Sequence, residues 1–289
     1  MPELPDVAIL ADALDVALGG RPLTGSKVAQ SLVLRGTPVE LAAFEGQTLL
    51  DVTRRGKFLV FRFERDKMVF NPMLTGRLGV VSAGAKAWGQ SAAMFEFGAA
   101  LGKARRHTWP AANATWLPRR DLGVELRYRD ATRMGKIYLM PAGVTRPVAG
   151  WDEQGPDADG PALTLDVWRE RIGRHSGELK SLLRNQAFVA GIGNAYSDEI
   201  LWAARLAPYR KRSSLAPDEV DALYSAARET LNWAIGELHV LVPPRLEVEQ
   251  RDFLNVHRKG GSACPRCGTR LSQVSAGGFD TTFCRGCQR

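Results

Sequence analysis

The chain has 289 residues, 45% of them hydrophobic and 24% charged, which is typical of a globular protein long enough for two domains. Lys and Arg outnumber Asp and Glu by 39 to 31, so the net charge is +8. This charge favours an anionic partner, nucleic acid before an acidic membrane face. No apolar run approaches the roughly 18 residues of a membrane helix. Residues 1–6 carry acids where a signal peptide is basic and then apolar, so we expect a soluble protein of the cytoplasm.

The first half of the chain predicts one helix followed by strands. We expect the helix over residues 6–18, because its apolar residues recur at helical spacing and two glycines follow it. Strands are expected over 27–81, and residues 124–129 alternate between apolar and polar side chains as a half-buried strand does. Residues 82–120 show no clear period. We interpret them as a long loop or insertion, more a surface excursion than a DNA-contacting segment.

The second half of the chain predicts helices. Prolines and glycines interrupt residues 141–162, which indicates a linker. Helical spacing follows near 164–174 and 178–187, and again from about residue 195. The longest helix is expected to begin at Pro217, because proline is favoured in the first turn.

The four cysteines of the chain lie together near its end. They form two CxxC pairs separated by sixteen residues, Cys264 and Cys267, then Cys284 and Cys287. Each pair offers two thiolates, and two pairs complete the tetrahedron that Zn²⁺ prefers. All four positions are filled by protein, so we predict one structural zinc ion per chain. Residues 245–289 also hold eight Lys and Arg against four Asp and Glu, which makes this module basic.

Two further signals have both a structural and a functional interpretation. In residues 191–194 (GIGN) two glycines make a tight turn, and Asn194 stands at a helix start. Asn194 could simply cap the helix, or its amide and the exposed N–H groups could hold a DNA phosphate. At the N-terminus, Pro2 follows Met1, and removal of Met1 would leave a free proline amine. Otherwise Pro2 only shapes the entry to the first helix.

Six motifs in register resemble the formamidopyrimidine-DNA glycosylase / endonuclease VIII family of base-excision repair enzymes. They are residues 2–5 (PELP), 54–57 (RRGK), 73–78 (MLTGRL), 126–130 (LRYRD), 191–194 (GIGN) and the CxxC pairs. The resemblance implies an α+β fold with an N-terminal helix and β-sandwich, a helix–two-turns–helix domain and a zinc-ribbon finger. The domains would be residues 1–140, a linker over 141–162, 163–245 and 246–289.

The resemblance also implies an activity, that of a bifunctional DNA glycosylase and abasic-site lyase. Pro2 would attack the sugar of an oxidised or ring-opened nucleotide to form a Schiff base, and Glu3 would act as the acid and base. Lys57 would grip the phosphate beside the lesion. The partner would be damaged double-stranded DNA, bound by a monomer. Met73 would fill the void left by the extruded base. Further DNA contacts are predicted for Asn194, Lys180, Arg133 and the finger residue Arg258.

The chain departs from the family pattern at three places, one of which is a longer segment before Trp116. The finger usually carries an arginine five residues before the third cysteine, where this chain has Phe279; Arg285 or Arg270 could substitute. The family's Asp-Pro-Arg-Arg-Phe-Gly stands here as residues 130–135 (DATRMG), so a weak or different opposite-base preference is expected. These departures leave a second hypothesis open, a catalytically impaired protein that binds damaged or unusual DNA.

Overall fold

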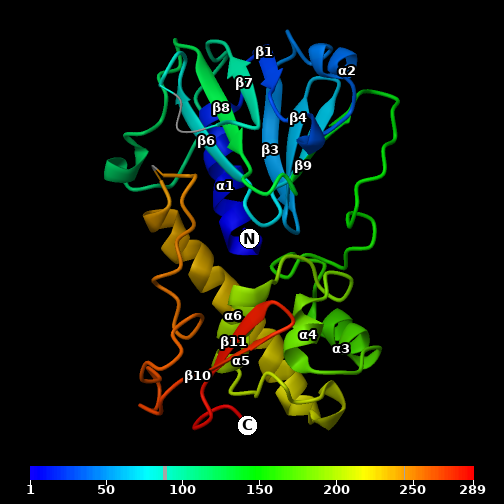
Figure 1. Cartoon of the computed structure of the whole chain (residues 1–289), viewed down its shortest axis with the longest axis vertical. Helices are drawn as coiled ribbons and strands as arrows, with labels where there is room; N and C mark the ends of the chain where they lie inside the picture. The colour runs from blue at the N-terminus through cyan, green and yellow to red at the C-terminus, as the bar shows by residue number, and fades with distance from the viewer. Residues whose placement is uncertain (87–89, 244) are drawn as a thin grey trace. The chain divides into compact units, whose positions relative to one another are not determined.

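The computed structural model describes residues 1–86, 90–243 and 245–289, and the chain forms two compact units (Figure 1). Unit 1 consists of Met1–Pro2, Asp6–Ala149 and Leu238–Gln250, and unit 2 of Glu3–Pro5, Gly150–Glu237 and Arg251–Arg289. The segment predicted as a linker contains no helix or strand. Its later part packs within unit 2, where Ala158 is fully buried in the core.

Unit 1 is built on two β-sheets. The four-stranded sheet is antiparallel and has the order β1 (Leu23–Val28), β7 (Ala93–Phe97), β8 (Val124–Arg129), β6 (Arg77–Ser82). The five-stranded sheet has the order β2 (Leu34–Arg35), β9 (Lys136–Met140), β5 (Lys67–Asn71), β4 (Phe58–Phe63), β3 (Leu49–Arg55). Within the second sheet, β2 pairs with β9 in parallel and the other pairs are antiparallel.

Aromatic side chains join the two sheets into a sandwich. Phe70 of β5 contacts Phe95 of β7 edge-on, with ring centroids 5.8 Å apart. Phe63 of β4 stacks on Phe97 of β7 at 6.5 Å. Such contacts carry much of the burial energy of a sandwich core. The β-rich first half is therefore a packed two-layer unit.

Strand β8 corrects the expectation of a half-buried strand. It lies between β7 and β6, and its polar residues Glu125 and Arg127 are only 6% and 4% exposed. The two side chains form an ion pair with an N–O distance of 2.6 Å, and Arg127 also donates to the carbonyl oxygen of Lys86. Mutual pairing therefore makes burial of the alternating polar face tolerable.

The helices and the proposed loop of the first half also differ from prediction. Helix α1 spans Leu4–Leu18, so it begins two residues earlier than expected, and α2 (Pro38–Ala42) interrupts the region expected to be strands only. The interpretation of residues 82–120 as loop was wrong at β7, which is central in its sheet. Residues 87–89 of that segment lie outside the described residues.

Unit 2 contains the predicted helices. They are α3 (Leu165–Gly173), α4 (Leu179–Arg184), α5 (Asn194–Ala203) and α6 (Pro217–Leu241), of which the last four residues belong to unit 1. Their inner faces meet around Trp168 and Tyr196, both fully buried. Helix α4 ends three residues before the predicted end. The short 3-10 helices of the chain are η1 (Ser31–Val33), η2 (Ala111–Ala114) and η3 (Arg212–Ser214).

A two-stranded hairpin closes unit 2. Strands β10 (Ser272–Ala276) and β11 (Phe279–Phe283) are antiparallel. Gly277 and Gly278 connect them with φ angles of 58° and 78°, the double positive φ of a type I′ hairpin turn, which glycine adopts without strain. None of the helices in the described part of the chain has the length and apolar character needed to cross a membrane.

Candidate active site and cysteine cluster

The Glu3 carboxylate is bound to the start of helix α5. It accepts hydrogen bonds from the backbone N–H groups of Gly193 and Ala195, each at 2.8 Å, and of Tyr196 at 3.2 Å. N–H groups at a helix start have no partner within the helix and form its positive end. The carboxylate, 3% exposed, satisfies them from outside the helix. Both of its oxygens are thereby held in one orientation.

The glycine turn before α5 gives Glu3 and Leu4 the space they occupy. A Cβ atom on Gly193 would lie 2.4 Å from the carboxyl carbon of Glu3. At Gly191, where φ is +103°, a Cβ atom would lie 2.5 Å from Leu4 Cδ1. The Leu4 N–H donates to the Gly191 carbonyl oxygen at 2.9 Å. The two glycines therefore form the tight turn that the sequence predicted, and they also leave room for Glu3 and Leu4 to pack against it.

Asn194 does not cap α5, so the capping interpretation was wrong. Gly193 is the N-cap residue, and Asn194 is the first helical residue. Its side-chain Nδ2 donates to the backbone oxygen of Asp280 at 3.0 Å. Its Oδ1 is buried with no hydrogen-bond partner among the described residues. Glu3 occupies the N–H groups of Gly193, Ala195 and Tyr196, so they are not available to a phosphate. The phosphate contact of Asn194 stays a prediction.

Lys180 is buried, and its placement does not support a direct contact with DNA. The side chain is 4% exposed. Its ammonium donates to Asp198 Oδ1 at 2.7 Å, to the Asp280 carbonyl oxygen at 2.9 Å and to Thr281 Oγ1 at 3.0 Å. An ammonium has three donors, and all are engaged. Burial lowers the pKa of Lys180, and the neighbouring Asp198 carboxylate opposes that shift. Lys180 fastens the finger hairpin to α4.

Pro2 is buried in unit 1 and lines a small pocket. The pocket is formed by Pro2, Asp6, Leu10, Arg77, Val242, Leu246, Val248 and Glu249. The Met1 amine lies 3.4 Å from Glu249 Oε1, and Arg77 donates to the other oxygen of Glu249 at 2.5 Å. Sequence reasoning missed Arg77 and Glu249, because no spacing signal connects them to residue 2.

Two other predicted residues lie in turns of unit 1. Lys57 is half-buried in the turn between β3 and β4, directly after Gly56, whose φ is +56°. Met73 is half-buried in the turn between β5 and β6, with a φ of +51°. Its N–H donates to the side chain of Asn71 at 3.2 Å. Met73 is thus not a core residue at a strand end. The roles predicted for Lys57 and Met73 stay predictions.

The 130–135 loop is shaped by the buried carboxylate of Asp130. It accepts hydrogen bonds from the Gly135 N–H at 2.7 Å, from Thr132 Oγ1 at 3.1 Å and from the Thr75 hydroxyl. Burial alone would raise the pKa of Asp130, but these hydrogen bonds hold it below its ordinary value. Arg133, with a φ of +57°, is left exposed. Exposure of Arg133 is compatible with the predicted DNA contact.

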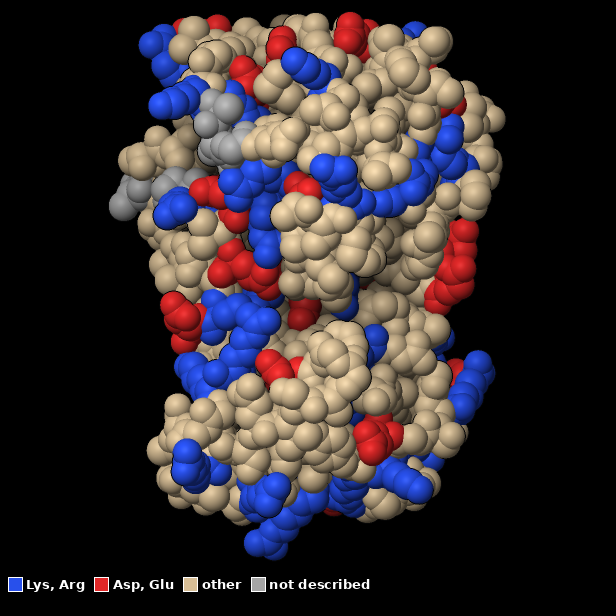
Figure 2. All heavy atoms as spheres, in the orientation of Figure 1, with Lys and Arg blue, Asp and Glu red and all other residues tan. Residues whose placement is uncertain are grey.

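Arg258 precedes the cysteine module and is also exposed. Its φ is +60°, and its N–H donates to Thr282 Oγ1 at 3.2 Å. Figure 2 shows Lys and Arg side chains on the visible face of both units. The predicted DNA contact of Arg258 stays a prediction.

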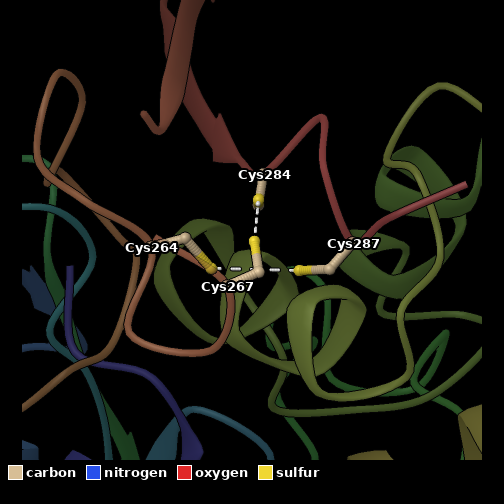
Figure 3. A group of neighbouring side chains, drawn as sticks. All are labelled: Cys264, Cys267, Cys284 and Cys287. Carbon is tan, nitrogen blue, oxygen red and sulfur yellow. Dashed lines mark hydrogen bonds between the residues drawn. The ribbon is translucent and has the colours of Figure 1, made fainter. Parts of the chain in front are cut away.

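The four cysteine sulfurs lie within 4.8 Å of one another, and none is in a disulfide. Figure 3 shows the side chains converging from the loop that holds Cys264 and Cys267 and from the segment after β11 that holds Cys284 and Cys287. Donors face the sulfurs from outside, as they do around metal thiolates. Trp202 Nε1 lies 3.4 Å from the Cys264 sulfur.

The acid–base properties of the cluster fit a cation. Burial alone would raise the pKa of Cys264, but the N–H groups of Trp202, Arg266 and Cys267 lower it to about 6. Burial raises the pKa of Cys287 to about 12. Four convergent sulfurs without a disulfide, one of them readily ionised, suit a soft divalent metal. The prediction that the four cysteines cluster where they could hold one metal ion is confirmed.

Comparison with known proteins identifies the family. Residues 1–137 match the N-terminal domain of formamidopyrimidine-DNA glycosylase, and residues 154–240 match its H2TH domain. The whole chain is 32% identical to the formamidopyrimidine-DNA glycosylase of Symbiobacterium thermophilum, of which it covers 89%. It is 30% identical to that of Pelotomaculum thermopropionicum, of which it covers 99%. The chain belongs to the formamidopyrimidine-DNA glycosylase family, as its motifs predicted.

Solved structures share the fold. A Lactococcus lactis Fpg variant in complex with DNA containing Fapy-dG matches with a TM-score of 0.83 and 22% identity over 100% of both chains. The complex of Lactococcus lactis Fpg with DNA containing an abasic site matches with a TM-score of 0.83 and 22% identity over 99% of both chains. The predicted fold class, an α+β protein with a helix–two-turns–helix domain and a C-terminal cysteine module, is confirmed.

Proposed function

We propose that the protein excises oxidised or ring-opened bases from damaged double-stranded DNA and then cleaves the strand at the abasic site. It is a DNA glycosylase with abasic-site lyase activity. The observation that carries this conclusion is its match, over the full chain, to the formamidopyrimidine-DNA glycosylases. The alternative of a catalytically impaired DNA-binding protein is not favoured.

Pro2 is the proposed nucleophile after removal of Met1. A free α-amino group has a pKa of about 8, so roughly a tenth of it is neutral near pH 7. The secondary amine attacks C1′ of the damaged nucleotide, and the base leaves with the proton of the amine. The C1′–O4′ bond then breaks, and O4′ takes up a proton as the sugar ring opens. The product is an iminium ion, which holds its positive charge without a proton and acts as an electron sink. A proton is then lost from C2′, and the bond to the 3′ phosphate breaks.

Glu3 is the proposed acid and base of these proton transfers. Its carboxylate is fixed by the N–H groups of Gly193, Ala195 and Tyr196. A catalytic carboxylate is effective when its orientation is set before the substrate arrives. The protein groups that set it belong to the first turn of α5, so the glycine turn contributes to the chemistry indirectly.

The proposed DNA contacts are those of exposed or half-buried residues. Lys57 and Asn194 bind phosphates near the lesion, and Met73 enters the space that the extruded base leaves. Arg133 and Arg258 bind the backbone elsewhere. Lys180, whose donors are all engaged, positions the hairpin and does not touch DNA.

We propose that the cysteine cluster holds one zinc ion. Its four ligands would be Cys264, Cys267, Cys284 and Cys287. With four protein ligands no position is open for water, so the ion would be structural and take no part in the reaction. It would fix the two CxxC turns and with them the finger hairpin.

The organisation of the working enzyme is proposed as follows. The protein acts as a monomer in the cytoplasm, where its DNA substrate would be found. Its functional domains are residues 1–140 and 163–245, joined by the linker over 141–162, and the zinc module 246–289.

Duplex oligonucleotides carrying single lesions test the function. A panel would contain a ring-opened purine, an oxidised pyrimidine, 8-oxoguanine opposite cytosine, and undamaged DNA. We expect excision and strand cleavage at the ring-opened purine or the oxidised pyrimidine in preference to 8-oxoguanine. Binding to every lesion without release of base or cleavage would reinstate the alternative function.

A further inference from the structure

The end of helix α4 carries an arginine stacked on the finger hairpin. The guanidinium carbon of Arg184, the last residue of α4, lies 3.6 Å from the ring centroid of Phe279, the first residue of β11. In such a cation–π contact the guanidinium is attracted to the face of the ring. The ring of Phe279 is 44% exposed, so the pair lies at the surface of unit 2.

The pair is held by hydrogen bonds on either side of it. Lys180, one turn before Arg184 on the same helix, and Asn194 of α5 both donate to the backbone oxygen of Asp280. Asp280 follows Phe279 directly, so these bonds fasten the start of β11 against α4 and α5. The backbone that carries the ring of Phe279 is therefore fixed beside the end of α4.

The donors of the Arg184 guanidinium are unused. No described residue accepts a hydrogen bond from it or forms an ion pair with it, and its guanidinium carbon lies over the ring of Phe279. Burial lowers the pKa of Arg184, while the more distant carboxylates of Glu3 and Asp198 raise it. Arginine remains protonated under such shifts. A half-buried, permanently charged group whose five N–H donors have no partner among the described residues is available to an anionic ligand.

We propose that Arg184, supported by Phe279, binds a backbone phosphate of the damaged strand and supplies the guanidinium that this chain lacks at position 279. Stacking occupies one face of the guanidinium and leaves its in-plane N–H edges free, which is the geometry that binds phosphate in a bidentate manner. The sequence suggested Arg285 or Arg270 as substitutes. The structure instead points to an arginine from another element. This inference rests on the proposed function.

The test measures binding of duplex DNA with an abasic-site analogue over a range of salt concentrations. Arg184→Ala is expected to weaken binding roughly 10-fold, because one charge-assisted hydrogen-bonding group is lost. The slope of log K against log salt should fall by about 0.9, the value for one phosphate contact. Arg184→Lys should recover only part of the affinity, because an ammonium cannot stack or bind in a bidentate manner.

Two further variants make the test specific. Placing arginine at the hairpin position in the double variant Arg184→Ala with Phe279→Arg should restore affinity and slope. The matched control is Arg174→Ala, which removes a guanidinium of unit 2 that is 68% exposed and paired with Glu170. This control should bind like the wild type. Melting temperature and zinc content of every variant report whether the unit is folded.

The outcomes separate this inference from the function on which it rests. Unchanged affinity and slope in Arg184→Ala, with the wild type still cleaving abasic DNA, would overturn the role of Arg184 alone. A wild type that binds but does not cleave would overturn the proposed function. If Arg184→Ala does not fold, Arg184→Lys decides: full wild-type affinity and slope in that variant would contradict bidentate binding.

Discussion

Replacing Glu3 with alanine should destabilise unit 2 as well as abolish activity. The substitution removes the acceptor of three backbone N–H groups at the start of α5. The site is 3% exposed, and a buried donor left without a partner costs about 1–3 kcal/mol. The low end for each of three donors gives a loss of about 3 kcal/mol in the free energy of unfolding. Glu3→Gln keeps one side-chain oxygen and should lose only about 1–2 kcal/mol.

Two measurements check this prediction. Urea denaturation gives the change in the free energy of unfolding. Hydrogen exchange of the segment 190–200 reports locally, because the three amides should exchange faster in Glu3→Ala than in the wild type. The matched control is Glu170→Ala in α3, whose side chain is 60% exposed; its stability should stay within about 0.5 kcal/mol of the wild type.

If Glu3→Ala has the same free energy of unfolding as the wild type, and the same hydrogen-exchange rates over residues 190–200, this prediction is wrong. That result would mean that the carboxylate does not hold the start of α5. If the prediction is confirmed, loss of activity in Glu3→Ala cannot be ascribed to proton transfer alone. Glu3→Gln is then the better variant for testing acid and base catalysis.

Three further predictions follow from single contacts. Gly193→Ala should lower both stability and activity, because a Cβ atom there would lie 2.4 Å from the carboxyl carbon of Glu3; unfolding and cleavage assays measure both. Asp130→Asn should cost about 1–3 kcal/mol near pH 7, since Asp130 accepts the Gly135 N–H and other donors. The pKa of Asp130 is lower in the folded protein than its unfolded value of 3.8. The stability difference between wild type and Asp130→Asn should therefore be largest above pH 3.8 and disappear as the pH falls through the folded-state pKa. Removal of zinc by a chelator, or Cys267→Ser, should abolish DNA binding and expose the finger to protease.

Each of these predictions has a result that contradicts it. Gly193→Ala with wild-type stability and activity would show that the turn accommodates a Cβ atom without disturbing Glu3. A stability difference between wild type and Asp130→Asn that is the same near pH 3 and near pH 7 would contradict the role of the carboxylate. A chelated protein that still binds DNA with wild-type affinity would show that the cysteine cluster does not support the finger.

The features that could be predicted from the sequence depend on local spacing. The cysteine cluster could be predicted because each CxxC motif spans four residues of one turn and so brings two sulfurs together locally. The 25-residue helix α6 was predicted from its apolar spacing and its initial Pro217. Strand β7 was missed although Ala93, Phe95 and Phe97 alternate as buried residues, because its five residues lie in a segment rich in alanine, glycine and tryptophan.

The features that could not be predicted join residues far apart in the chain. The bond between Glu3 and Gly193 spans 190 residues, and no spacing rule connects the two. The contact between Arg184 and Phe279 joins a helix end to a hairpin turn that the sequence placed in different domains. Asn194 was a good cap by residue type, but Glu3 occupies the N–H groups that a cap would bind, so tertiary contact overrode local preference.

The most direct test of the account is to reduce the reaction on abasic duplex DNA with borohydride and to map the trapped adduct by mass spectrometry. The proposed mechanism predicts a covalent adduct on the N-terminal peptide, at the amine of Pro2, in protein that has lost Met1. An adduct on a lysine, or no adduct in protein with an unblocked Pro2, would contradict it.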